Sequence, residues 1–118
     1  MTQEDKELLL KDLCARLPYG VKIQVPYEDG SGYFDEIVWE VNNDGPFHVN
    51  GWGIEYEYVK PYLFPLSSIT KKTLEELSAY IDIKNAYVAV EFFNSHHIDY
   101  RGLIEKGLAI DATGKNIY

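Results

Sequence analysis

Cysteine is nearly absent from this sequence. Cys14 is its only cysteine in 118 residues, so no internal disulfide can form, and no CxxC pair or Cys/His ladder indicates structural zinc. Long apolar runs are also missing, since none approaches the roughly 20 residues that span a bilayer. The acidic start MTQEDKELLL lacks the layout of a signal peptide. We therefore expect a cytoplasmic protein in a reducing compartment, with no membrane segment, metal or cofactor.

Basic residues are scarce in the middle of the chain. The net charge is −8. Residues 1–20 carry four acids and three bases, residues 21–59 carry eight acids and only Lys22, and residues 60–118 carry seven of each. Such a field repels nucleic acid phosphates and anionic membranes and attracts basic surfaces. We therefore expect an unidentified protein partner with a basic surface, and no direct binding to nucleic acid.

The length and composition fit a single domain over residues 1–118. Apolar residues make up 46% of the chain and aromatic residues 14%, which favours a real core over disorder. The pattern divides the domain into four parts: a helix at 1–17, acidic antiparallel strands at 21–59, a proline-bracketed crossing segment at 60–69, and a helical part at 70–118.

The first part has the features of an amphipathic helix. Thr2 and Asp5 have the spacing of a capping box, and Pro18 with the following glycine ends the pattern. The apolar residues between them recur at helical spacing, which places Cys14 in the core. This stripe consists of Leu9, Leu10, Leu13, Cys14 and Leu17.

The second part alternates with a period of two, which is typical of half-buried strands. Strands are predicted at 21–25, 33–41 and 54–58, with a short one near 47–49 and turns at EDGSG and NNDGP. In the second strand, Ile37, Trp39 and Val41 are predicted to face the core, and Glu36, Val38 and Glu40 to face water.

The C-terminal half favours helices after an extended stretch. Pro61 and Pro65 exclude regular helix and fit an extended path across the core. Helical spacing follows at 71–81. Residues 86–93 fit either a strand or a helix, and we choose a helix over about 85–96. A short helix at 100–106 is then predicted between an Asp99 cap and Gly107, and the tail with Leu108, Ile110 and Ile117 packs back on the core.

The predicted fold class is therefore α+β. It has an N-terminal helix, a small antiparallel sheet or partly closed barrel of about four strands, and two or three C-terminal helices.

The stretch HHIDYRG resembles a chemical site. His96 and His97 are adjacent, so on a helix they point about 100° apart and cannot chelate one ion together. His97 with Asp99 or Arg101 could form an acid–base pair. The favoured interpretation is that these residues mark the end of one helix and the start of the next.

Acidic and aromatic residues form the remaining candidate site. The paired carboxylates alternate with core residues on short strands, which favours a solvated face over a glycosidase cleft. The tyrosines fit either a core or a binding surface. The candidate interaction surface consists of Glu36, Glu40, Glu55, Glu57, Trp52 and Tyr62.

Three stretches carry a resemblance: EDKELLLKDLCARLPYGVK, YVKPYLFPLSSIT and DYRGLIEKGLAIDATGKNIY. Together they resemble a set of short, uncharacterised proteins encoded by anaerobic gut bacteria, their phages and mobile elements. The resemblance covers both ends and the proline segment, roughly half the chain. It implies no catalytic residue, because the set has no assigned activity, and it favours small binding proteins that act on a host process.

The leading hypothesis is a non-enzymatic protein-binding module. One alternative is an acidic mimic of DNA that inhibits a nucleic-acid-binding enzyme, which would need carboxylates spaced like phosphates along one surface. The other is a small enzyme that uses His97, Asp99 and Arg101, which would need these side chains to converge on one cleft.

Overall fold

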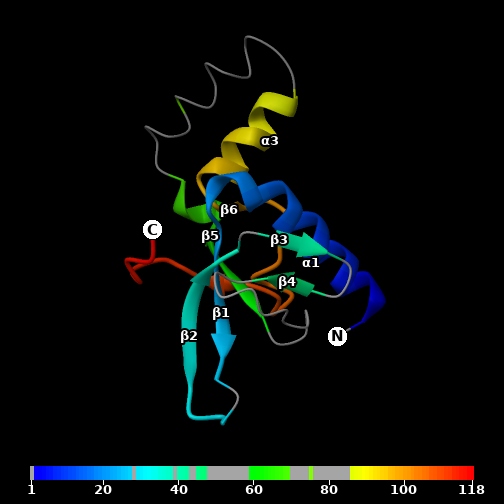
Figure 1. Cartoon of the computed structure of the whole chain (residues 1–118). Coiled ribbons are helices and arrows are strands. Elements are labelled where there is room, and N and C mark those ends of the chain that lie inside the picture. The colour runs from blue at the N-terminus through cyan, green and yellow to red at the C-terminus, as the bar shows by residue number, and fades with distance from the viewer. Residues whose placement is uncertain are drawn as a thin grey trace.

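A computed structural model describes residues 2–27, 29–38, 40–42, 45–47, 59–69, 75 and 86–118, with the backbone alone at 40–42, 45–47 and 86–88. It contains an N-terminal helix, a mixed sheet and a later helix (Figure 1). The predicted α+β class is confirmed.

The first helix, α1, spans Gln3–Arg16 and begins as the sequence predicts. The Thr2 hydroxyl accepts a hydrogen bond from the Asp5 N–H at 3.0 Å, and the Asp5 carboxylate accepts one from the Thr2 N–H at 3.4 Å. The capping box is therefore confirmed. The 3₁₀ turn η1 (Leu17–Tyr19) follows, and Gly20 at φ +69° turns the chain into the sheet because glycine adopts this conformation without strain.

The buried face of α1 differs from the predicted one. Its buried residues are Leu9, Asp12, Leu13 and Arg16, whereas Cys14 is exposed. This face is rotated by roughly 80° from the predicted stripe, because Asp12 and Arg16 enter the interior as a bonded pair. The prediction that Cys14 lies in the core is wrong.

Strands β1 (Lys22–Pro26) and β2 (Tyr33–Ile37) form the predicted antiparallel hairpin. At its turn the Tyr27 N–H donates to the Gly32 carbonyl at 2.9 Å. Figure 1 shows the hairpin projecting beyond the rest of the molecule. We call this hairpin, from β1 through the turn to β2, the arm.

The end of β2 turns the opposite face to the core from the predicted one. Val38 is 1% exposed, and its N–H donates to the Val21 carbonyl at 3.0 Å, whereas Ile37 is 43% exposed. Glu36 pairs with buried Ile23, so it lies half-buried on the core side. Because a strand alternates its faces, one shift of phase reverses every side chain. The prediction of Ile37 inside with Glu36 and Val38 outside is wrong.

Strand β5 (Lys60–Pro65) is the proline-bracketed segment, and its extended path is confirmed. It pairs antiparallel with β1 and parallel with β6 (Ile98–Asp99) and β7 (Ile110–Asp111). The five-stranded sheet is therefore mixed, and the wholly antiparallel sheet predicted from the sequence is wrong. The 3₁₀ turn η3 (Leu66–Ser68) follows β5.

A second, two-stranded sheet joins β3 (Glu40–Asn42) to β4 (Gly45–Phe47). The strand predicted at 54–58 lies outside the described residues. So does the helix predicted at 71–81, apart from the helical Glu75.

Helix α3 spans Ala86–Ser95, so the choice of helix for this stretch is confirmed. The short helix predicted at 100–106 is wrong, because the chain there forms turns. Gly102 has φ +75°, and a left-handed residue cannot continue a right-handed helix. In the described residues beyond 69, α3 is the only helix with defined bounds, so the predicted set of two or three C-terminal helices is not found there.

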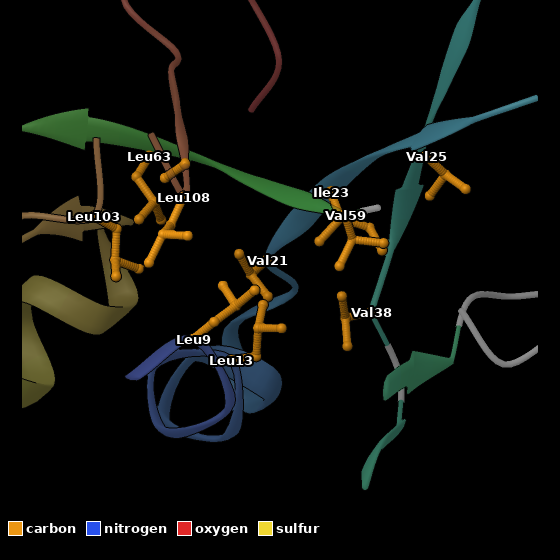
Figure 2. Packing of buried hydrophobic residues seen from close by; sticks show 11 residues of the cluster. Leu9, Leu13, Val21, Ile23, Val25, Val38, Val59, Leu63, Leu103 and Leu108 are labelled. Carbon is orange, nitrogen blue, oxygen red and sulfur yellow. The ribbon is translucent and has the colours of Figure 1, made fainter. Parts of the chain in front are cut away.

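The main core lies between α1 and the sheet. Figure 2 shows Leu9 and Leu13 of α1 directed at Val21 and the neighbouring strands. The turns after Gly102 close one end of this core. Its buried members are Leu9, Leu13, Val21, Ile23, Val25, Val38, Val59, Leu63, Leu103, Leu108 and Ala109. The predicted packing of Leu108 onto the core is confirmed.

Candidate functional site

The two histidines lie at the C-terminal end of α3, as the sequence predicts. The Nδ1 atom of His96 lies 2.9 Å from the Phe92 carbonyl of the last helical turn, and its ring stacks on the Phe92 ring at 4.2 Å. His97 follows with φ +57°, the left-handed conformation that ends many helices.

Asp99 organises the turns that follow β6. Its two carboxylate oxygens accept the N–H groups of Leu103 and Ile104, each at 2.9 Å. Asp99 therefore binds the N–H groups of a set of turns, whereas the helix that it was predicted to cap is not formed there. The carboxylate thus holds the backbone of these turns through one hydrogen bond to each oxygen.

A buried ionic cluster joins the two ends of the chain. We give this name to Asp12, Arg16 and Arg101. The Arg16 Nε donates to one Asp12 oxygen at 2.9 Å, and the Arg101 Nη1 donates to the other at 3.2 Å. Arg16 also donates to the carbonyls of Phe93 and Ile98. The pKa of Asp12 is raised, because the burial that opposes its charge outweighs the two arginines that favour it.

The ionic cluster packs against an aromatic ring. The guanidinium carbons of Arg101 and Arg16 lie 4.6 Å and 5.4 Å from the centroid of the Tyr100 ring, and that ring stacks on Phe93 at 5.6 Å. These are cation–π distances. The cluster holds α1 against α3 and β6, and its contacts are those of a structural brace. The sequence signal that could have found it is the Asp12–Arg16 spacing of one helical turn.

His97 is buried, and its ring stacks on a residue other than its two predicted partners. Burial is the main cause that lowers its pKa to about 4, and the charges of Arg16, His96 and Lys22 add to the effect. Its ring stacks on Tyr118 at 3.8 Å between centroids, with 11° between the planes. Within the described residues, no hydrogen bond joins His97, Asp99 and Arg101 to one another; each has its own internal contacts.

The arm carries three exposed large apolar side chains, Tyr27, Tyr33 and Ile37, and Tyr33 is the most exposed of those that the structure describes. Tyr33 is 63% exposed, Ile37 is 43% exposed, and Asp35 between them is also exposed. Alternate residues of a strand share a face, so we call Tyr33, Asp35 and Ile37 the arm face. At the tip, Tyr27 is 48% exposed beside the Phe34 ring, with centroids 5.1 Å apart.

The arm face also lies in the acidic part of the chain. No lysine or arginine occurs between Lys22 and Lys60, while eight acids do. Asp35 and the exposed Asp29 of the turn are two of them. Glu36 lies half-buried on the other side of β2, so the neighbouring acids Asp35 and Glu36 face in opposite directions.

The candidate surface chosen from the sequence is only partly described. Tyr62 is 4% exposed, and its hydroxyl donates to Asp35, so its ring lies inside and does not form a binding surface. Glu36 is half-buried. Glu40 is described in its backbone alone, and Trp52, Glu55 and Glu57 lie outside the described residues. Sequence reasoning missed Tyr27, Tyr33 and Ile37, although the tyrosines beside the EDGSG turn were a usable signal.

Neither a metal centre nor a membrane helix emerges from the part of the chain that the structure describes. No group of three His, Cys, Asp or Glu side chains there is placed to hold a metal ion. No helix there combines the length and the apolar character needed to cross a bilayer.

No family model, curated protein or solved structure that we compared with this chain matches it. The function is therefore inferred from the geometry and charge of the arm.

Proposed function

We propose that this chain is a non-enzymatic protein-binding module that docks through the arm face onto a partner with a basic surface. The observation that carries this proposal is the joint exposure of Tyr33 and Ile37 on one strand face, with Asp35 between them. Tyrosine is enriched in the centres of protein interfaces, where its ring adds contact area and its hydroxyl stays hydrogen-bonded.

The negative charge of this part of the chain favours a positively charged partner. The stretch between Lys22 and Lys60 contains eight acids and no lysine or arginine, so its field attracts lysine- and arginine-rich surfaces and speeds their encounter. Exposed apolar side chains alone would accept many partners. Acids of the same stretch, of which the structure places Asp35 on the arm face and Asp29 at its turn, favour a basic partner and make the association weaken as salt rises.

The two alternatives gain less support from the structure. An enzyme that uses His97, Asp99 and Arg101 would need these groups free to act, whereas each is held by internal contacts. A mimic of DNA would need carboxylates in rows, whereas Asp35 and Glu36 face opposite sides of β2. We place the binding module in the cytoplasm, since a single cysteine fits a reducing compartment.

Affinity capture with matched variants tests the proposal. The full chain is immobilised and exposed to a lysate of the source cells at low and high salt, as wild type, Tyr33→Ser, Ile37→Ser and Leu66→Ser. Leu66 is the control because it is an exposed apolar residue outside the arm. It lies in η3, which follows the end of β5 that pairs with β6.

We expect one protein to be captured by the wild type and by Leu66→Ser, and about tenfold less of it by either arm variant, since loss of an interface anchor costs more than 1 kcal/mol. Its capture should fall with rising salt. Recovery of no partner at any salt concentration, or equal capture by all four proteins, would count against the proposal.

A further inference from the structure

A tyrosine hydroxyl group is inserted between the arm and the central strand, where β1 meets β5. In the described chain β1 pairs with β5 at Ile23↔Pro61 and Gln24↔Lys60. The next pair in this register would join Lys22 to Tyr62. There the Tyr118 hydroxyl accepts the Lys22 N–H at 2.8 Å and donates to the Tyr62 carbonyl at 2.8 Å. One phenol thus takes the place of a direct bond of the sheet.

A second phenol ties the arm face to β5. The Tyr62 hydroxyl donates to the Asp35 carboxylate of β2 and accepts a hydrogen bond from the Gln24 side chain of β1 at 3.3 Å. Both strands of the arm are therefore fastened to one side chain of the central strand. Asp35 is also the acid of the arm face, so the same network reaches the proposed docking surface.

The segment that carries Tyr118 is held mainly by its last two residues. The Tyr118 ring stacks on His97, and the Lys22 ammonium donates to the Ile117 carbonyl at 2.6 Å. Residues 113–116 are exposed. A tyrosine with its ordinary pKa of about 10 keeps its proton at neutral pH, and burial raises the pKa of Tyr62 and of Tyr118 further, to about 12, so both phenols remain donors.

We propose that Tyr118 and Tyr62 form a hydroxyl latch that fixes the direction of the arm, and that release of the segment 117–118 frees the arm to move. This inference rests on the proposed function, in which the arm face is the docking surface. A fixed arm presents this face in one geometry, which lowers the ordering cost of binding. Release of the latch would raise that cost and weaken docking without altering any residue of the arm face.

Distance measurement between two spin labels tests the latch without a partner. Cys14 is exposed on α1 and is the only native cysteine, so it takes the first label. Ser31→Cys at the exposed arm turn takes the second. Pulsed electron paramagnetic resonance then gives the distribution of distances between the arm tip and α1 in the full chain.

The variants compared are Tyr118→Phe, Tyr62→Phe and, as control, Tyr19→Phe, which also loses a hydroxyl but lies in η1. Each change keeps the ring, and near-ultraviolet circular dichroism confirms that each protein is folded. We expect both latch variants to give a distribution at least about twofold broader than wild type, because a released arm samples more orientations. The Tyr19→Phe distribution should match wild type.

The result separates the latch from the docking proposal. Equal widths in all four proteins would overturn the latch and leave the capture experiment unaffected. A broadening in Tyr19→Phe equal to that in the latch variants would also overturn it, because the loss of any hydroxyl would then suffice. Failure of the arm-face variants in the capture experiment would overturn the docking proposal and leave the mechanics of the joint standing.

Discussion

The Arg16 guanidinium and the Asp12 carboxylate meet at 2.9 Å, one helical turn apart, with both side chains fully buried. Their burial rotates α1 from its leucine stripe and brings Arg101 to the same carboxylate. A charge removed from water is tolerated only when it is paired and hydrogen-bonded. The ionic cluster thus links the N-terminal helix to the segment after β6 through a contact of two residues 89 positions apart.

Arg16→Met should be strongly destabilising, because it leaves Asp12 buried with one partner and frees the carbonyls of Phe93 and Ile98. We expect a loss of about 3 kcal/mol in the free energy of unfolding, measured by urea denaturation. Lys11→Met, on the exposed side of the same helix, is the matched control and should change the value by less than about 0.5 kcal/mol. Equal effects of the two changes would mean that the ionic cluster does not stabilise the fold.

The buried His97 should make the stability of the fold sensitive to acid. Its pKa in the folded state is about 4, below the ordinary value of 6.5, so between these values the unfolded chain binds a proton that the folded chain refuses. The free energy of unfolding should therefore fall as the pH drops from about 6.5 to about 4, by up to about 3 kcal/mol. Above pH 6.5 this contribution is constant.

The matched variant for the pH dependence is His97→Asn, since asparagine tolerates the left-handed φ of this position. The pH dependence of its unfolding free energy should lack the step between pH 6.5 and 4, while other titrating groups act equally in both proteins. Parallel curves for wild type and variant would show that His97 does not titrate differently in the two states.

Several elements could be predicted from the sequence because their signals are local. The capping box of Thr2 and Asp5, the glycine-rich turn of the arm and the helical spacing of α3 depend on neighbouring residues only. The wrong predictions concern features that depend on residues far apart in the sequence or on a choice between two apolar neighbours. The faces of α1 and β2 were wrong because Arg16 needs partners far along the chain, and because Ile37 and Val38 are both apolar, so alternation alone does not decide which is inside.

The parallel pairing of β5 with β6 and β7 also had no local signal, since these short strands follow β5 in the sequence by more than 30 positions. The arm face was missed for a related reason. Its exposure follows from the register between the two strands of the arm, which pairs Tyr33 with Pro26 and Ile37 with Lys22 on the face opposite the buried Ile23. Composition indicated the acidic region, and only the fold shows which side chains in it face solvent.

Gly102 should be a sensitive position because it holds φ +75° in the chain that follows β6. Gly102→Ala should lower the free energy of unfolding by about 1 kcal/mol, although nothing lies within 4 Å of the added carbon. Gly102→Asn should cost less, since asparagine visits this conformation more readily. Urea denaturation measures both. An alanine variant as stable as wild type, with more helix by circular dichroism, would show that residues 99–107 favour the helix predicted from sequence.

Cys14 should react as a surface thiol. Because it is exposed on α1, the native protein should consume one equivalent of a thiol reagent within a few-fold of the rate of the unfolded chain. Cys14→Ser should change the free energy of unfolding by less than about 0.5 kcal/mol. A native thiol that reacts only after denaturation would place Cys14 back in the core and would contradict the observed orientation of α1.

Amide hydrogen exchange tests docking through the arm face most directly. It is measured on the full chain with and without the partner that the capture experiment recovers. Docking through the arm face predicts that exchange slows in β2 and in the arm turn when the partner binds, while exchange in α1 stays unchanged. Slowing confined to α1 or to residues 103–107, with β2 unaffected, would contradict it.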